Sequence, residues 1–182
     1  MTRMSFGALA LALALGLCTT TALRAQQRQP TEGTRFGLGV GPTFPMGNYG
    51  DVDKMGVNLL GVVQFSLAST TPVHLRVDGI YSSTSHDAGS GSTSILGGNV
   101  SLLYHFGAPR APARPYVLGG LGFYNVDAFG SSETKIGFGF GGGVLFGLGA
   151  FNAFAEARYL SVQTSGSSIT FVPLTVGLMF GN

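Results

Sequence analysis

Charged side chains are scarce in this chain of 182 residues: Asp, Glu, Lys and Arg make up 10% of it, against roughly 25% in soluble domains. Ten are basic and eight are acidic. Two of the basic residues, Arg3 and Arg24, lie in the first 25 residues, so the rest of the chain carries eight charges of each sign. This balance provides neither a basic stripe for nucleic acid nor a charged interaction tail.

Cysteine is represented only by Cys18. Residues 26–182 therefore hold no disulfide, no thiolate metal site and no thiol nucleophile. The segment before Cys18 is loosely similar to a lipobox, but Leu17 is too large for the position before a lipidated cysteine. We therefore favour a cleaved leader over a lipid anchor.

Long apolar runs are also rare, and the clearest one lies at the start of the chain. Arg3 precedes an apolar run over residues 6–17, and small and polar residues follow it. This order is typical of a secretory signal peptide, and the run is shorter than the ~20 residues of a spanning helix. We predict a signal peptide at residues 1–25 and a short flexible lead-in at 26–33.

Glycine, by contrast, is abundant, with 30 residues where ~7% is usual. In the segment 135–148, KIGFGFGGGVLFGL, glycine alternates with large apolar residues. Alternate side chains of a strand point to opposite faces, so this strand has one large apolar face and one nearly bare face. A face exposed to water is normally polar. The pattern therefore favours an inside-out barrel, with large groups against lipid and small ones where opposite walls of a narrow barrel converge.

The same alternation recurs along the chain and predicts eight strands. Their lengths are close to the ~9–11 residues with which a tilted strand crosses a bilayer. They are expected at residues 34–44, 55–68, 73–83, 94–106, 115–126, 135–148, 153–162 and 169–180. The facing of the fifth is ambiguous because Tyr116, Val117 and Leu118 interrupt its alternation.

The connections are expected to alternate between long external loops and short periplasmic turns. The long ones are predicted at 45–54, 84–93, 127–134 and 163–168, and the short ones at 69–72, 107–114 and 149–152. With eight strands, both ends of the barrel segment lie on the short-turn side.

Closure of the barrel follows from the membrane environment, because every backbone N–H and C=O in hydrocarbon needs a partner within the protein. Residues 34–182 are therefore predicted to form an all-β, eight-stranded antiparallel up-and-down transmembrane barrel. A cationic side chain facing lipid would cost ~2–4 kcal/mol at the midplane. The mid-strand charges all fall opposite the apolar series and form a candidate interior charge network: Arg76, Asp78, Glu156 and Arg158.

Three segments carry a resemblance to a known family: RPYVLGGLG at 114–122, FAEARY at 154–159 and VPLTVGLMF at 172–180. With them the chain resembles the small outer-membrane β-barrels, the eight-stranded relatives of the outer-membrane protein A barrel and the opacity proteins. The resemblance implies insertion by the outer-membrane assembly machinery, which reads a final strand ending in an aromatic residue. Here Phe180 is followed by two further residues. The family has no common catalytic set, so the resemblance implies no activity.

Enzymatic and metal chemistry receive little support from the remaining motifs. The neighbours His86 and Asp87 lie in a Ser/Gly-rich segment and invite the hypothesis of a lipid-modifying enzyme, but that composition is typical of a turn. A metal site needs three or four convergent ligands, and the three histidines lack such a spacing. We predict no enzyme activity, no metal and no cofactor.

The leading hypothesis is a monomeric protein of a Gram-negative-type outer membrane, with a structural or surface-interaction role and an interior filled by side chains. Its partners would be outer-membrane lipids and lipopolysaccharide. Since loops on a rigid scaffold often bind partners, the candidate external contacts are Tyr49, Asp51, Asp53, His86 and Asp87. The alternatives are a narrow pore for water or small ions, and a secreted, soluble lipocalin-like barrel whose apolar series points inward.

Overall fold

The computed structural model describes residues 33–67, 71–86, 91–108, 111–128, 131–164 and 167–181. The predicted signal peptide, the lead-in up to residue 32 and Asp87 lie outside these residues. The chain divides into two units, Met1–Thr31 and Glu32–Asn182, and all that follows concerns the second. Among the described residues, no helix has the length and apolar character to cross a membrane.

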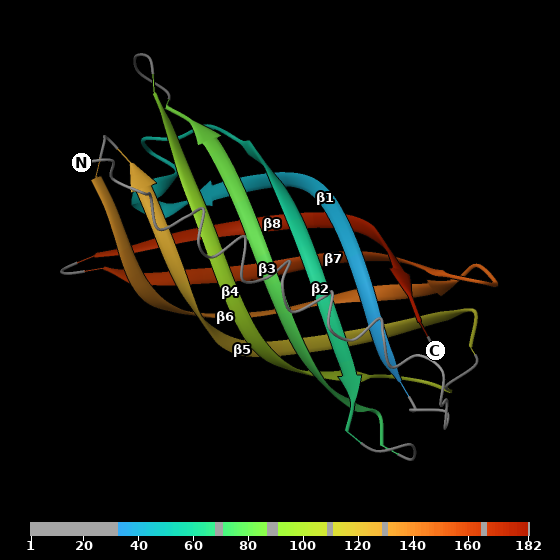
Figure 1. Ribbon diagram of the computed structural model, residues 1–182. Coiled ribbons are helices and arrows are strands. Elements are labelled where there is room, and N and C mark those ends of the chain that lie inside the picture. Colours follow the sequence, from blue (N-terminus) through green and yellow to red (C-terminus); the bar gives the residue numbers. More distant parts are fainter. Residues whose placement is uncertain are drawn as a thin grey trace, which may run out of the picture. The chain divides into compact units, whose positions relative to one another are not determined.

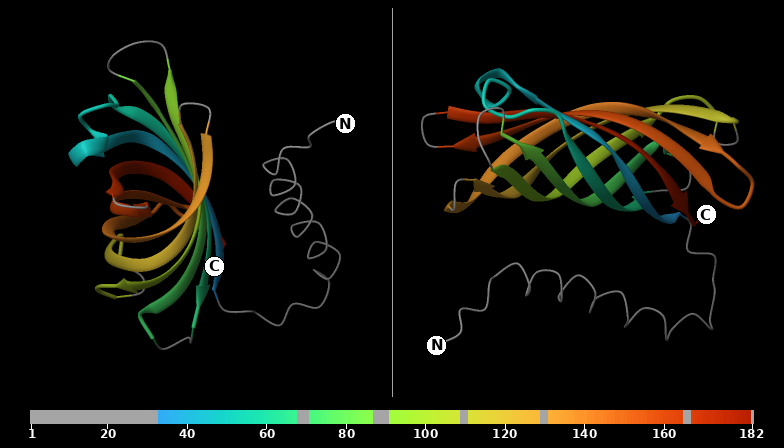
Figure 2. Two further views of the ribbon diagram at one scale, coloured as in Figure 1. Left: turned by 90° about the vertical axis from the view of Figure 1, so that its left-hand side faces the viewer. Right: turned by 90° about the horizontal axis from the view of Figure 1, so that it is seen from above.

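Eight antiparallel strands close into one barrel, each paired with its neighbours in the chain and β1 paired with β8 (Figures 1 and 2). The strands are β1 (Thr34–Met46), β2 (Gly56–Ser66), β3 (Val73–Ser85), β4 (Ser92–His105), β5 (Ala113–Ala128), β6 (Ser131–Gly147), β7 (Asn152–Thr164) and β8 (Ser167–Phe180), with the short helix η2 (Gly47–Tyr49) after β1. The predicted fold class is confirmed.

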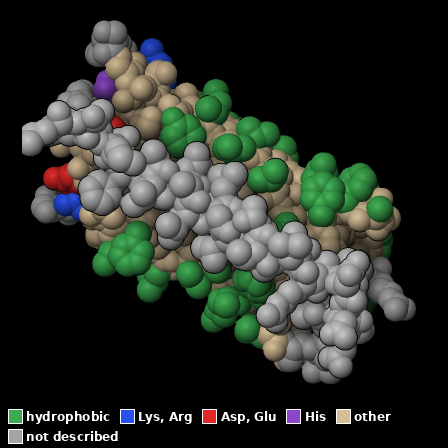
Figure 3. Space-filling view, in the orientation of Figure 1, with side chains coloured by type: hydrophobic (Ala, Val, Ile, Leu, Met, Phe, Trp, Pro, Cys, Tyr) green, Lys and Arg blue, Asp and Glu red, His purple; other side chains and the backbone are tan. Residues whose placement is uncertain are grey.

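Large apolar side chains cover the outside of the barrel. Leu38, Leu121 and Phe123 are each about two-thirds exposed, at 67%, 65% and 65%. Figure 3 shows such side chains along the barrel wall, with charged groups at the end where β1 leads into β2. Strands β1–β6 and β8 expose large hydrophobic side chains, and β7 exposes Ala155 and Ala157. The lipocalin-like alternative, which needs the apolar series inside, is therefore wrong.

The bare face of β6 makes room for large side chains from the strands beside it. A Cβ atom at Gly143 would lie 2.6 Å from the Tyr116 hydroxyl, and one at Gly137 would lie 2.7 Å from the Tyr124 ring, both on β5. Towards β7, a Cβ at Gly139 would collide with Leu160. The prediction that glycine relieves crowding holds, but the crowding side chains come from adjacent strands rather than from the opposite wall.

The connections fall on the predicted ends, and the lengths predicted for 45–54, 107–114 and 149–152 are close to those observed, but two predicted long loops are much shorter. β5 runs to Ala128 and β6 starts at Ser131, while β7 runs to Thr164 and β8 starts at Ser167. The supposed long loops at 127–134 and 163–168 are therefore mostly strand. Polar Ser and Thr residues pair in a ladder as readily as apolar ones, so their appearance marks the edge of the apolar band and not the end of a strand.

The seam between β1 and β8 has a gap in its pairing. The Cα register runs to Val40–Val176 and resumes at Thr43–Pro173, because prolines at positions 42 and 173 have no N–H to donate. Asn58 of β2 covers the gap: its Nδ2 donates to the carbonyls of Gly41, Pro42 and Leu174 at 2.9–3.2 Å. A side-chain amide thus satisfies carbonyls that the ladder leaves without partners.

Candidate functional site

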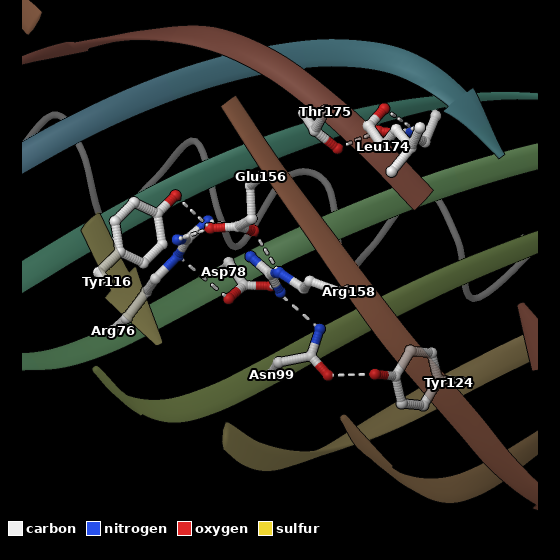
Figure 4. Close-up of polar contacts among 10 residues, drawn as sticks. Arg76, Asp78, Asn99, Tyr116, Tyr124, Glu156, Arg158, Leu174 and Thr175 are labelled. Atoms are coloured by element: carbon white, nitrogen blue, oxygen red, sulfur yellow. Dashed lines mark hydrogen bonds and ion pairs between the residues drawn. The ribbon is translucent and has the colours of Figure 1, made fainter. Parts of the chain in front are cut away.

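Two pairs of charged residues meet in the middle of the barrel, one pair from β3 and one from β7 (Figure 4). These strands lie four positions apart in the closed order, on opposite walls. The guanidinium of Arg76 holds the Glu156 carboxylate with both terminal nitrogens, Nη1 to Oε2 at 2.6 Å and Nη2 to Oε1 at 3.3 Å. This two-pronged contact is the strongest geometry for an arginine–carboxylate pair.

The second arginine closes the set into a ring of alternating charges. Arg158 donates through Nη1 to Asp78 Oδ2 at 2.8 Å and through Nε to Glu156. Arg76 Nε lies 3.5 Å from Asp78 Oδ1. All four side chains are at most 3% exposed, and the two positive and two negative charges cancel. The structure thus brings together the four residues of the predicted interior network across the lumen.

Three neutral residues extend this network, and the sequence did not single them out. Tyr116 donates its hydroxyl to Glu156 Oε2 at 2.6 Å, and Asn99 Nδ2 donates to Asp78 Oδ2 at 3.0 Å. Tyr124 in turn donates to Asn99 Oδ1. Asn99 lies on the same face of β4 as Ser101, and this polar alternation within an apolar strand was a usable signal. The irregular alternation at residues 116–118 hid the inward facing of Tyr116.

The lumen is filled at this level. A void beside Arg158, bounded also by Asn99 and Leu160, has no room for a water molecule. An eight-stranded barrel is just wide enough for side chains to fill its interior. Large apolar side chains, including Ile80, Leu103 and Phe154, lie inside with the charged groups and are at most 2% exposed. The interior is therefore a packed core with a charged centre.

At the loop end, three of the predicted external contacts are turned into the barrel mouth. Tyr49 is 9% exposed and Asp53 3%. Thr84 bridges them, with 2.6 Å from its hydroxyl to Tyr49 Oη and 2.6 Å to Asp53 Oδ2. Burial raises the pKa of Tyr49 to about 12, so its phenol stays protonated at neutral pH. Asp51 is exposed.

His86 belongs to the same mouth. It forms an isolated bridge with Asp53, and its Nε2 lies 3.6 Å from Asp53 Oδ1. The same nitrogen lies 3.3 Å from the Thr93 hydroxyl. A hydrolytic relay needs the carboxylate on one ring nitrogen and the nucleophile on the other, so Asp53 and Thr93 do not form a relay with His86.

At the opposite end, where β1 begins and β8 ends, the other two histidines face each other inside the barrel. Their rings meet edge to face with centroids 4.9 Å apart. His74 Nδ1 lies 3.1 Å from Ser66 Oγ, and His105 Nε2 lies 3.4 Å from Gln64 Nε2. No group of three or more His, Cys, Asp or Glu residues suited to a metal ion occurs in the described parts of the chain.

Comparison with protein families gives one match: the model of the family described as "Outer membrane protein beta-barrel domain" matches residues 10–180. A search of curated proteins gives no match.

Solved structures of several outer-membrane barrels share the fold. Neisserial surface protein A matches 82% of this chain and 97% of its own, with a TM-score of 0.66 and 18% identity. The outer membrane enzyme PagL matches 81% and 99%, with a TM-score of 0.58 and 14% identity. The outer membrane protein OprG from Pseudomonas aeruginosa matches 86% and 100%, with a TM-score of 0.52 and 12% identity.

Proposed function

Because the chain belongs to the family of outer membrane protein beta-barrel domains, we propose that it is a closed, non-conducting barrel of the outer membrane with a structural or surface-interaction role. The observation that carries this proposal is the charge ring of Arg76, Asp78, Glu156 and Arg158, which joins opposite walls through the lumen. Moving an ion through it would require breaking buried, paired charges, and removing one partner of such a pair costs ~3–5 kcal/mol.

Contacts with partners would be made at the loop end. Asp51 is exposed there, and the outer face of the β5–β6 hairpin becomes polar beyond Phe123, with Asn125 hydrogen-bonded to Ser132 and Thr134. The apolar wall below this end would contact outer-membrane lipids and lipopolysaccharide. The final strand, ending at Phe180, would be read by the assembly machinery. A monomer suffices for all these roles.

Conductance across a planar lipid bilayer tests the closed lumen. We expect no stable single-channel current from the wild type and none from a matched variant at the exposed mouth, Glu133→Gln. A steady current in the wild type that changes in Glu156→Gln or Arg158→Gln would instead establish the narrow pore. That second candidate is favoured by the polar groups that line the interior from end to end, among them Gln64, Asn58 and Thr43.

An enzyme activity is the weaker candidate. Its one support is the fold shared with the outer membrane enzyme PagL, and fold alone does not carry function. Lipid hydrolysis measured with wild-type and His86→Ala barrels in mixed micelles tests it: we expect no turnover by either protein. Turnover that is lost in His86→Ala would overturn this expectation.

A further inference from the structure

Two arginines, one buried and one half-buried, lie at the end of the barrel opposite the loops, and the described residues offer them no counter-charge. Arg114, near the start of β5, is 8% exposed, and Arg35, near the start of β1, is half-buried. Arg114 Nε and Arg35 Nη1 are buried without a hydrogen-bond partner. Among the described residues, no carboxylate forms an ion pair with either side chain. An unpaired buried cation is costly, so such an arrangement calls for an explanation.

Both side chains line one cavity of about 320 Å³, which opens at this end of the barrel. Its remaining walls are small or apolar residues from the β4–β5 turn, the end of β6 and the β6–β7 turn, together with Asn152 at the start of β7. Among the described residues, no acidic side chain lines it. The volume falls at the lower end of the range for small-molecule sites, about 300–1,000 Å³.

The chemistry of this lining selects for an oxyanion. Each guanidinium offers five N–H donors and no acceptor, and its planar fork matches a carboxylate or a phosphate. β1 and β5 lie on opposite walls, so the arginines approach the cavity from two sides. Asn152 adds an amide that can donate as well. The nearest titratable neighbours toward the interior, His74 and His105, bring no negative charge.

The geometry points to a binding site for a small, water-borne oxyanion, of the phosphate or carboxylate class, at the periplasmic mouth of the barrel. The lining contains two guanidinium groups and one amide and none of the exposed large hydrophobic residues of the outer wall, so the ligand is expected to arrive from water. The site depends neither on a closed lumen nor on the loop-end contacts, so it would bind its ligand whether or not the barrel conducts.

Calorimetric titration of inorganic phosphate into the folded mature chain, in neutral detergent at low salt, tests the site. We expect saturable binding at one site, at least tenfold weaker in Arg114→Gln and in Arg35→Gln. The matched control is Lys135→Gln, which removes one positive charge at the other end, where Lys135 pairs with Glu133 at 2.9 Å. Its affinity should equal that of the wild type.

Three results would overturn the proposal: no saturable binding by the wild type, unchanged binding by both arginine variants, or an equal loss in Lys135→Gln. A parallel titration with a short-chain phosphatidic acid separates the sources of the phosphate. Binding of that lipid without binding of inorganic phosphate would replace the water-borne ligand by a headgroup. Gel mobility with and without boiling shows whether each variant is folded. If Arg114→Gln fails to fold, Arg35→Gln, at the more exposed residue, is used to test the site.

Discussion

Among the described residues, two pairs of arginines face the inside of the barrel, and the two pairs have opposite surroundings. Arg76 and Arg158, at mid-barrel, meet two carboxylates and form a neutral ring. Arg35 and Arg114, at the turn end, meet a cavity of about 320 Å³ and no carboxylate among the described residues. Arginine thus forms a neutral ion-pair ring in one place and lines a cavity without a carboxylate among the described residues in the other.

This difference shows that burial alone does not determine whether an arginine forms internal ion pairs or lines a cavity. A buried charge is tolerated when its neighbours compensate it, and breaking the compensation costs more than the pair itself contributes. At mid-barrel the carboxylates of Asp78 and Glu156 compensate the charges of the arginines. At the turn end, water or a ligand has to compensate the charges of Arg35 and Arg114. Three comparisons of variants would sharpen or break this contrast.

Glu156→Gln should have the largest effect, because Glu156 accepts from Arg76, Arg158 and Tyr116 at once. We expect the free energy of unfolding to fall by about 3–5 kcal/mol, the cost of leaving buried charges uncompensated. Urea titration in lipid vesicles, followed by the gel mobility of unheated samples, measures it.

The control for that measurement is Glu133→Gln, because the Glu133 side chain is 61% exposed and its carboxylate pairs with Lys135 at 2.9 Å. Exposed pairs contribute roughly 0–1 kcal/mol, so this variant should unfold almost as the wild type does. Equal losses in the two variants would mean that the central ring is not the element that stabilises the lumen.

Tyr116→Phe and Tyr124→Phe make the same change on one strand but remove different partners. Tyr116 donates to the charged Glu156, whereas Tyr124 donates to the neutral Asn99. Hydrogen bonds to charged groups contribute about 1.5–3 kcal/mol and neutral ones about 0.5–1.5 kcal/mol. Tyr116→Phe should therefore be the more destabilising in the same urea titration, and the reverse order would place the energetic centre near Asn99.

Arg114→Gln should have the smallest effect on stability, because among the described residues no carboxylate pairs with Arg114 and its buried Nε has no hydrogen-bond partner. In phosphate-free buffer we expect its unfolding free energy to stay within about 0.5 kcal/mol of the wild type, or to rise as an uncompensated charge is removed. A loss as large as that of Arg158→Gln, measured in parallel, would erase the contrast between the two pairs.

Much of the fold was readable from the sequence because the period of a strand is local. Side chains two residues apart in a strand lie on the same face. Phe138 and Phe140 therefore indicated the lipid-facing side, and Glu156 and Arg158 indicated the interior. The number of strands and the end on which each connection lies followed from the same pattern. Strand ends did not follow, since Ser131 and Ser167 lie in ladders that continue past the apolar band.

Only the tertiary structure determined which side chains meet across the lumen. Arg76 and Glu156 are 80 residues apart in the chain, and their contact depends on the stagger of all the strands between them. The same holds for the burial of Tyr49 and Asp53, which the loop composition had suggested were exposed, and for the mouth shared by Arg35 and Arg114. Alternation along one strand determines whether a residue faces the lumen or the lipid. Its position along the barrel axis is determined only when the barrel closes. That position decides whether an inward-facing arginine lies beside a carboxylate or beside a cavity.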